Sequence, residues 1–475
     1  MSSTFRGCVA VALALATVAG ATLTSAFLNG VNAQQDETSN TSVNIGFLEV
    51  LFSGIDAAGN RGLWITNGKS AGTHELTGIV GANANGILGG SVGFSPGFTQ
   101  LNGEVVFSGL DAANNIGLWV TNGTAAGTHE LTGINGAYSG GLFTGNFAGF
   151  TVLGGNVLFG GRNTAGYTSV WATDGTVAGT HELSGIGGAG FFGVLSGLNV
   201  DMVAFGDEAL FEGLDAANNN GLWVTNGTAA GTYELTGISG AYTGSGGLFG
   251  RSATTGSAFP PDFTVFNSAV LFNGLGTAGN NGLWATDGTA AGTHELIGIS
   301  GIAATGVDPH YLTAFNGEVL FEGTEADGTK GLWVTDGTAA GTHELTGISG
   351  ANPGGLNPSY LTVFNNKVLF NGLNAAVKRG LWVTDGTAAG THELTDISGA
   401  DANGLDPSNF AVMNNEVLFL GASVPNGKPG LWMTNGTSHG THELTDISGA
   451  NTGGLSPSGL TVVTVLHAIK VPGGK

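Results

Sequence analysis

Residues 331–351 read GLWVTDGTAAGTHELTGISGA, and close copies of this phrase recur through the chain. All eight Trp residues stand at the third position of a copy, and successive copies are 49 to 61 residues apart. Repeats of this length are typical of solenoids, propellers and arrays, in which each unit buries its apolar face against the next. One repetitive fold is therefore predicted. The tryptophans are Trp64, Trp119, Trp171, Trp223, Trp284, Trp333, Trp382 and Trp432.

Each repeat divides into four short segments with the features of β-strands. In the seventh repeat an apolar segment, LTVF at 361–364, is followed by Asn-Asn at 365–366, a pair that favours a type I′ hairpin. KVLFNG at 367–372 and GLWVT at 380–384 form the second and third strands, and the HELT-type residues after the next turn form a fourth. Four antiparallel strands in eight repeats predict an all-β, eight-bladed β-propeller.

A ring of blades must close, because an open ring leaves two apolar faces in water. Nine apolar segments, from 43–47 to 460–466, have the pattern of inner strands, but the repeats contain only eight second strands. We expect the C-terminal segment 460–466 to join the first blade and close the ring. An open, curved solenoid is the alternative.

The amino-terminal segment has the features of a secretory signal peptide. A positive charge at Arg6 precedes an apolar core at 8–20, and small residues precede a cleavage site after Ala33 or, earlier, after Ala26. We therefore expect a secreted or cell-surface protein in the extracellular or periplasmic space. The predicted parts are a signal peptide at 1–33, a leader at 34–42, the eight-repeat propeller at 43–466 and a tail at 467–475.

The composition limits the classes of partner. The 475 residues include 88 Gly, 12 Lys and Arg, and 34 Asp and Glu, giving a net charge of −22. This acidic balance excludes a general affinity for nucleic acid or anionic membranes, both of which attract basic surfaces. The 41% of apolar residues is enough for a core, but after the signal segment no stretch is long and apolar enough to span a membrane. We expect a monomer.

The repeated phrase resembles that of the bacterial secreted proteins with tandem ELWxxDGTxxGT repeats. In the sixth repeat the match consists of LW at 332–333, DGT at 336–338 and GT at 341–342. The resemblance implies a propeller-like repeat fold at an exported or cell-surface location, and it implies no common chemistry. The leading Glu of the motif is Gly in seven repeats here, and SV at 169–170 replaces Gly-Leu in the third.

Two repeated polar positions are interpreted as structural. The acid of the DGT turn is Asp in four repeats and Asn in four, an exchange typical of a turn residue. A His-Glu pair begins the fourth strand, with His in seven repeats and Glu in all eight. Adjacent strand residues face opposite sides of a sheet, so the pair cannot converge on one atom. We interpret it as protection of the outer edge strand, with surface metal binding or pH-dependent adhesion as the alternatives.

The loops between second and third strands are candidates for calcium binding. Asp56, Asp111 and Asp215 begin runs of carboxylate and amide side chains, which are oxygen ligands of the kind that Ca²⁺ takes. The spacing matches no EF-hand loop, and a polar loop without a ligand is the preferred interpretation. The sequence indicates no other cofactor.

No nucleophile elbow, phosphate loop or HExxH motif is present, so we assign no catalytic or cofactor-binding residue. Near-identical repeats favour a secreted non-enzymatic binding or surface-structural protein that presents a propeller face to glycan, matrix or protein. A secreted polysaccharide lyase or hydrolase with its site at the channel mouth is the alternative. Few features break the repeat symmetry, and we interpret them as drift: the insertion at 248–262 with Arg251 and Pro260-Pro261, the pair His310-Tyr311, and His439.

Overall fold

The structure is a computed structural model that describes residues 42–89, 96–143, 149–195, 200–244, 246–250, 261–425 and 427–470. The predicted signal peptide, all of the leader but Ser42, and the end of the tail lie outside these residues. Two compact units are present: a large one, Glu49–Val463, and a small one formed by the segments on either side of it. In the part of the chain that is described, no helix is long and apolar enough to cross a membrane.

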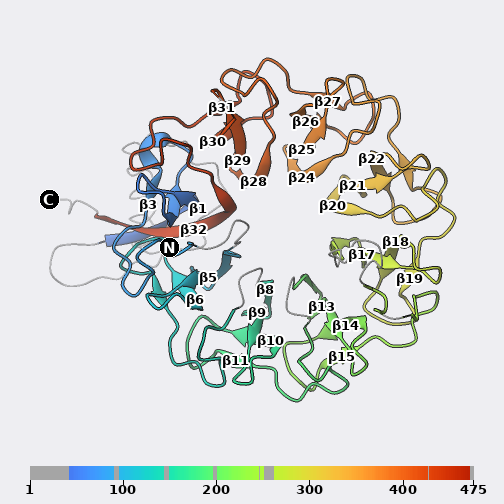
Figure 1. Ribbon diagram of the computed structural model, residues 1–475, viewed down its shortest axis with the longest axis horizontal. Coiled ribbons are helices and arrows are strands. Elements are labelled where there is room, and N and C mark those ends of the chain that lie inside the picture. The colour runs from blue at the N-terminus through green and yellow to red at the C-terminus, as the bar shows by residue number, and fades with distance from the viewer. Residues whose placement is uncertain are drawn as a thin grey trace, which may run out of the picture. The chain divides into compact units, whose positions relative to one another are not determined.

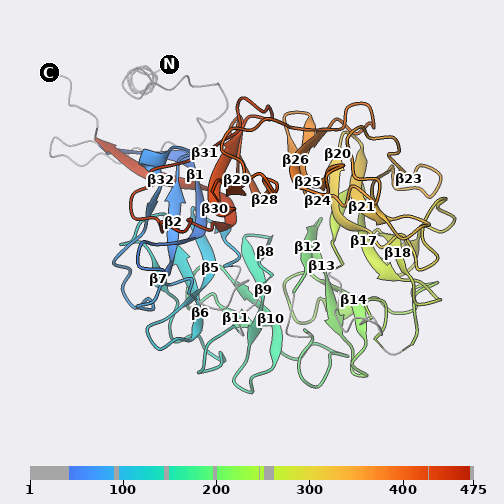
Figure 2. The same cartoon turned by 45° about the horizontal axis from the view of Figure 1, so that its top comes forward.

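The large unit contains eight four-stranded antiparallel sheets arranged as blades of a ring (Figures 1 and 2). One blade consists of β20 (His310–Phe315), β21 (Glu318–Thr324), β22 (Lys330–Thr335) and β23 (His343–Glu344), from the inner strand to the outer. The predicted all-β, eight-bladed β-propeller is confirmed.

The other blades repeat this order. From inner to outer strand they are β4 (Thr99–Leu101), β5 (Glu104–Leu110), β6 (Ile116–Thr121) and β7 (His129–Glu130); β8 (Thr151–Leu153), β9 (Asn156–Arg162), β10 (Thr168–Thr173) and β11 (His181–Glu182); β12 (Met202–Phe205), β13 (Glu208–Leu214), β14 (Asn220–Thr225) and β15 (Thr232–Glu234); β16 (Thr264–Phe266), β17 (Ala269–Leu275), β18 (Asn281–Thr286) and β19 (His294–Glu295); β24 (Ser359–Phe364), β25 (Lys367–Leu373), β26 (Arg379–Thr384) and β27 (His392–Glu393); β28 (Ser408–Met413), β29 (Glu416–Ser423), β30 (Lys428–Thr434) and β31 (His442–Glu443); and β32 (Ser458–Lys470), β1 (Ser42–Ile55), β2 (Arg61–Thr66) and β3 (His74–Glu75).

The C-terminal strand closes the ring, as predicted, because β32 takes the inner place beside β1. The separate inner strand expected at 43–47 is not formed. Those residues are the first part of β1, which runs unbroken to Ile55. No Asx-Gly pair interrupts this stretch, so nothing turns the chain before the second-strand residues. β32 continues to Lys470, four residues beyond the predicted end of the repeat domain.

The small unit pairs the beginning of β1 with the end of β32. Gly46 lies close to the methyl group of Thr464, where a larger side chain would collide. The ring of Phe47 meets the ring of His467 edge to face, with centroids 5.4 Å apart. These contacts join the two segments of the small unit to each other.

The hydrophobic core of the large unit lies between neighbouring blades. Every Trp is buried, and its ring lies against the Phe of the adjoining second strand, as in the Phe52–Trp64 pair with centroids 6.2 Å apart. This pair from the first blade packs with Leu418 and Leu431 of the eighth. The contact that joins neighbouring blades elsewhere therefore also joins the eighth blade to the first. Each large apolar side chain buried in it stabilises the folded ring by about 1.5–3 kcal/mol.

The glycine of the GLW phrase is explained by the glutamate of the fourth strand. Glu393 is paired with Trp382, and its side chain folds back over Gly380. A Cβ atom at Gly380 would lie 2.0 Å from Glu393 Oε1. His392, the residue before this glutamate, is exposed, so the two residues point to different sides, as predicted.

Replacing Gly380 by Ala is expected to lower the free energy of unfolding by about 1–3 kcal/mol, because the Glu393 side chain must leave its place. Urea unfolding of the variant and the wild type measures the difference. In a protein that already carries Glu393→Ala, adding Gly380→Ala should cost much less free energy of unfolding than it does in the wild type. An equal penalty in both backgrounds would contradict the packing argument.

Candidate functional site

The three calcium candidates lie in three separate blades, each closing its own loop. The Oδ1 atom of Asp56 accepts the backbone N–H of Asn60 at 2.8 Å, and Oδ2 accepts the Asn60 side-chain amide at 3.3 Å. Asp111 and Asp215 form the same two bonds with the residues four positions later. Within the described ranges, no three His, Cys, Asp or Glu side chains gather in a metal-binding group. Calcium binding stays the alternative to the preferred interpretation of a polar loop without a ligand.

The DGT turns show why Asp and Asn exchange freely. Asp336 Oδ1 accepts the amide of Thr338 at 2.8 Å and its hydroxyl at 2.7 Å. Asn122 accepts the same two groups from Thr124, at 3.1 and 2.7 Å. An Asp and an Asn side chain supply the same acceptor, and the interpretation as a turn residue is confirmed.

One inner-strand position differs strongly between the repeats. It lies five residues before the first residue of the hairpin pair. Seven of its eight occupants adopt the left-handed backbone region, with φ of 52° at Asp262 and 57° at both Tyr311 and Tyr360. This conformation suits Gly and Asn but costs another residue about 1–2 kcal/mol. Around the ring the position holds Gly97, Gly149, Asp201, Asp262, Tyr311, Tyr360, Asn409 and Gly459.

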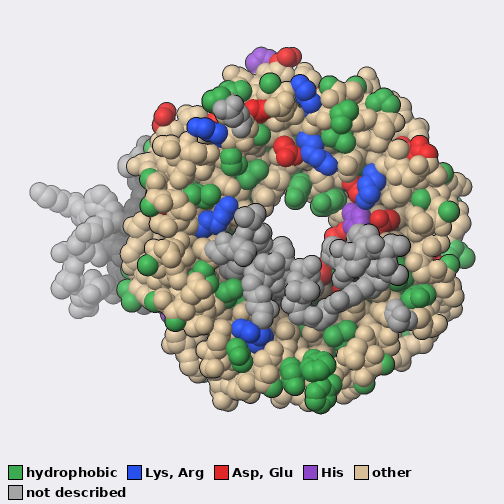
Figure 3. Space-filling view, in the orientation of Figure 1, with side chains coloured by type: hydrophobic (Ala, Val, Ile, Leu, Met, Phe, Trp, Pro, Cys, Tyr) green, Lys and Arg blue, Asp and Glu red, His purple; other side chains and the backbone are tan. Residues whose placement is uncertain are grey.

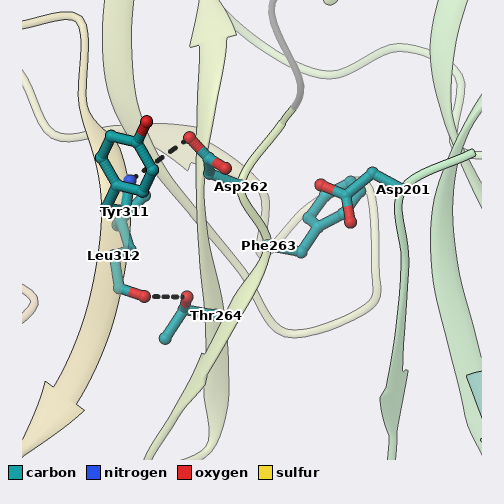
Figure 4. Close-up of a pocket in the computed structure, with 6 residues that line it drawn as sticks. All are labelled: Asp201, Asp262, Phe263, Thr264, Tyr311 and Leu312. Atoms are coloured by element: carbon teal, nitrogen blue, oxygen red, sulfur yellow. Dashed lines mark hydrogen bonds between the residues drawn. The ribbon is translucent and has the colours of Figure 1, made fainter. Parts of the chain in front are cut away.

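The chemically distinct occupants of this position form one pocket. Asp201 and Asp262 lie just before the inner strands β12 and β16, and Tyr311 lies in β20, the inner strand of the next blade. The three residues line an open pocket of about 170 Å³ with Phe263, Thr264 and Leu312 (Figure 4). Figure 4 shows the Asp262 carboxylate between Tyr311 and Phe263. The Thr264 hydroxyl donates to the Leu312 carbonyl at 2.8 Å and joins two of these strands.

Two symmetry-breaking features interpreted above as drift therefore meet here. Asp262 ends the insertion, and the pair at 310–311 belongs to the next blade. His439 lies in the turn between β30 and β31 and is not part of the pocket. Arg251 and Pro260 lie outside the described residues. The signal that sequence reasoning missed is that these features share one register position.

His310 joins two aspartates beside the pocket. Its Nδ1 atom lies 2.9 Å from Asp262 Oδ2, and its Nε2 atom lies 3.4 Å from Asp308 Oδ1. Burial alone would lower the pKa of His310, but the hydrogen bonds and charges of the two carboxylates raise it to about 9. The imidazole is therefore protonated at neutral pH. A His side chain and acidic side chains meet at the edge of the central hollow in Figure 3.

Asp201 has the second unusual titration. Its carboxyl group accepts the backbone N–H groups of Asp262 and Phe263 from the next blade. Burial, together with the charge of Asp262, raises the pKa of Asp201 to about 6 despite these bonds. A carboxyl group with this pKa exchanges a proton near neutral pH, which general acids and bases need.

Two tyrosine rings, an ion pair and a hydrogen-bonded arginine belong to the neighbouring blades. Burial raises the pKa of Tyr311 to about 12, so its phenol keeps its proton, and the rings of Tyr311 and Tyr360 have centroids 5.6 Å apart. The neighbouring Lys330 ammonium is 2.6 Å from Glu322 Oε1. Arg379 Nη1 donates to Asn371 Oδ1 at 3.3 Å. The arrangement offers a proton-exchanging carboxyl, a second carboxylate and two adjacent rings.

Raising the pH from 6.5 to about 9 is expected to remove about 2–3 kcal/mol of stability through His310. The folded state holds the His310 proton more tightly than the unfolded state, so this contribution is present below pH 6.5 and is lost as the pH rises through about 9. His310→Ser, which introduces the serine of the next two blades, should flatten the slope in urea unfolding between these pH values. His343→Ser, at an exposed rim histidine, is the control. Identical slopes in all three proteins would contradict the ion-pair assignment.

No family model and no curated protein sequence matches this chain. Among solved structures it is similar to a puromycin hydrolase, with 12% identity over 74% of this chain and 53% of that one, and a TM-score of 0.43. A prolyl endopeptidase shares 12% identity over 92% and 61% of the two chains, with a TM-score of 0.42. The β-propeller domain of the Trilobed protease from Pyrococcus furiosus shares 12% over 75% and 99%, with a TM-score of 0.38. This chain spans about half the length of the puromycin hydrolase.

The prediction of a non-enzymatic binding or surface-structural protein, and with it the expectation of no catalysis, is corrected here, because the similar structures named above belong to hydrolases and peptidases. At 12% identity this likeness concerns the propeller fold and does not supply a reaction for this chain. The structure adds a physical reason. The repeats do not form eight equivalent weak sites, because the residues that differ between them, Asp201, Asp262 and Tyr311, line one pocket.

Proposed function

We propose that this chain is a secreted polysaccharide hydrolase whose reaction takes place in the pocket at the starts of β12, β16 and β20. The observation that carries the proposal is the pair Asp201 and Asp262, two carboxyl groups in one open pocket, with the pKa of Asp201 raised to about 6. Glycoside hydrolysis uses two carboxyl groups of this kind, one protonated and one ionised.

The proposed reaction assigns one role to each carboxyl group. Asp201 donates its proton to the oxygen of the glycosidic bond as the bond between that oxygen and the anomeric carbon breaks. A water molecule adds to the anomeric carbon and gives its proton to Asp262. The protonated His310 holds Asp262 in place through Oδ2 and is a positioning residue.

The tyrosines support sugar as the substrate. Tyr311 and Tyr360 occupy a backbone conformation that a glycine or asparagine would adopt without strain, as in four other blades. Strain of this kind persists at functional sites, where a side chain is needed. Two adjacent rings beside the acid offer flat apolar surfaces on which sugar rings can stack, while the carboxylates and phenols bond to hydroxyl groups.

Product analysis tests the proposal. The purified full chain is incubated with xylan, mixed-linkage β-glucan, amylopectin, polygalacturonate and, as a separate arm, a peptide library. New reducing ends from a polysaccharide, without unsaturated sugars, are the expected result. Unsaturated products would assign a lyase, new peptide amines would assign a peptidase, and no product from any substrate would mean that the pocket does not catalyse hydrolysis. Each of these results would overturn the proposal.

A further inference from the structure

Three aromatic side chains form an exposed cluster away from the pocket. Tyr167 precedes β10, and Phe191 and Phe192 lie in the connection from β11 to β12. The ring centroids are 6.0 Å apart for Tyr167 and Phe191, 5.4 Å for Tyr167 and Phe192, and 5.2 Å for the two phenylalanines. Phe191 and Phe192 are 76% and 59% exposed. We call these three residues the aromatic platform.

The fold does not require aromatic residues at these places. The turn that carries the two phenylalanines is closed by a bond from the Gly193 amide to the Gly190 carbonyl. The same bond, from the Gly355 amide to the Asn352 carbonyl, closes the corresponding turn in the connection from β23 to β24. Every other repeat has small or polar residues between these two bonding positions: 84–85, 139–140, 245–246, 304–305, 353–354, 402–403 and 452–453. The place of Tyr167 is Asn in four repeats, at 60, 115, 219 and 280.

The platform and the pocket lie at the same end of the blades. Tyr167 lies in the loop between β9 and β10, and Phe191 and Phe192 lie in the connection from β11 to the inner strand β12. In an antiparallel blade both connections lie at the end where the inner strands begin, and the pocket is lined at the starts of β12, β16 and β20. The connection that carries Phe192 leads to Asp201, nine residues later in the chain. Nine residues span at most about 30 Å. A polymer chain could therefore contact both the pocket and the platform.

The size of the platform indicates what kind of ligand it takes. Two phenylalanines exposed to this extent present roughly 300 Å² of aromatic surface. A stable protein interface needs about 800 Å² on each partner, so the platform is too small for a protein and of a size suited to a few sugar rings. It contains no charged side chain, and the net charge of −22 opposes an anionic polymer.

We propose that the aromatic platform of Tyr167, Phe191 and Phe192 is a secondary binding site for a neutral polysaccharide strand that also enters the pocket. The sugar rings stack on the exposed faces of the aromatic rings. The link between platform and pocket rests on the proposed function, and the inference deepens it by naming a neutral polymer as the substrate class.

Binding without turnover tests this inference. Affinity gel electrophoresis measures the retardation of the Asp201→Asn variant by xylan, mixed-linkage β-glucan, amylopectin and, as the anionic polymer, polygalacturonate. Co-sedimentation measures the binding of the same variant to phosphatidylcholine vesicles. Adding Phe191→Ala and Phe192→Ala should weaken binding to the polymer that retards the protein by about tenfold or more. The control is Tyr233→His, which replaces another exposed aromatic residue by the residue of the other repeats and should leave binding unchanged.

The outcomes separate this inference from the proposed function. Three results would contradict the proposal that the platform binds a neutral polysaccharide. They are equal retardation with and without the phenylalanines, stronger retardation by polygalacturonate than by the neutral polymers, and Phe-dependent binding to phosphatidylcholine vesicles in place of the neutral polymers. If the wild type hydrolyses a polysaccharide but the phenylalanine substitutions leave polymer binding unchanged, the proposed function is supported and the binding site at the platform is wrong. Phe-dependent binding of a neutral polymer without any turnover would support the platform and overturn the hydrolase.

Discussion

Replacing Asp201 by Asn is expected to lower kcat/KM for the polysaccharide by about 100-fold or more, because a positioned general acid contributes a factor of about 10²–10⁴. The amide has the same shape but cannot give a proton to the leaving oxygen. The measurement is the initial rate of reducing-end release at several polymer concentrations. Thermal unfolding of the variant verifies that the propeller stays folded.

Asp207→Asn is the matched control for this experiment. Asp207 lies in the exposed hairpin between β12 and β13 of the same blade, so its replacement changes the net charge equally without touching the pocket. The wild type and this control should lose activity as the pH rises through about 6, where Asp201 gives up its proton. A similar loss of activity in both variants, or an Asp201 variant within fivefold of the wild type, would remove Asp201 from the reaction.

Deleting residues 458–475 is expected to abolish cooperative unfolding. The deletion removes the inner strand of the first blade with the buried Leu460 and Val463, and it uncovers the Trp64 side of the ring. These losses amount to about 5 kcal/mol or more, which is comparable to the whole stability of many domains. Calorimetry and the binding of a hydrophobic dye report the loss.

A shorter deletion, of residues 464–475, is the matched control. It leaves the part of β32 that belongs to the large unit and removes only the part in the small unit. We expect this variant to keep a cooperative transition close to that of the wild type. Wild-type behaviour in both deletions would show that β32 does not hold the ring closed.

The fold was largely predictable because each blade repeats the same local signals. The Trp spacing, the Asx-Gly hairpins and the alternating apolar segments define four strands per repeat, and the surplus C-terminal segment indicates closure. The error at 43–47 has a local cause, since an apolar segment was counted as a strand of its own without a turn to end it. The contact of Glu393 with Gly380 could not be predicted, because the two residues meet only when the strands pair.

The candidate site was visible only in part. Asp262 and His310 are 48 residues apart, and they meet because they occupy neighbouring register positions in consecutive blades. An alignment of the repeats by strand register, rather than a search for motifs, shows that Asp262 and Tyr311 occupy the same position in consecutive repeats. Asp201 could not have been chosen from sequence, because its pKa depends on burial and on the charge of Asp262 in the next blade.

The proposed reaction requires that Asp201 exchange its proton near neutral pH in the pocket that it lines with Asp262. NMR titration of the protein labelled with ¹³C at aspartate carboxyl carbons tests it most directly, with Asp201→Asn to assign the resonance. We predict a resonance that titrates with a pKa of about 6 and is absent from the variant. If the resonance lost in the variant titrates near 4, in the ordinary range of aspartate, the assignment of a general acid to this pocket is wrong.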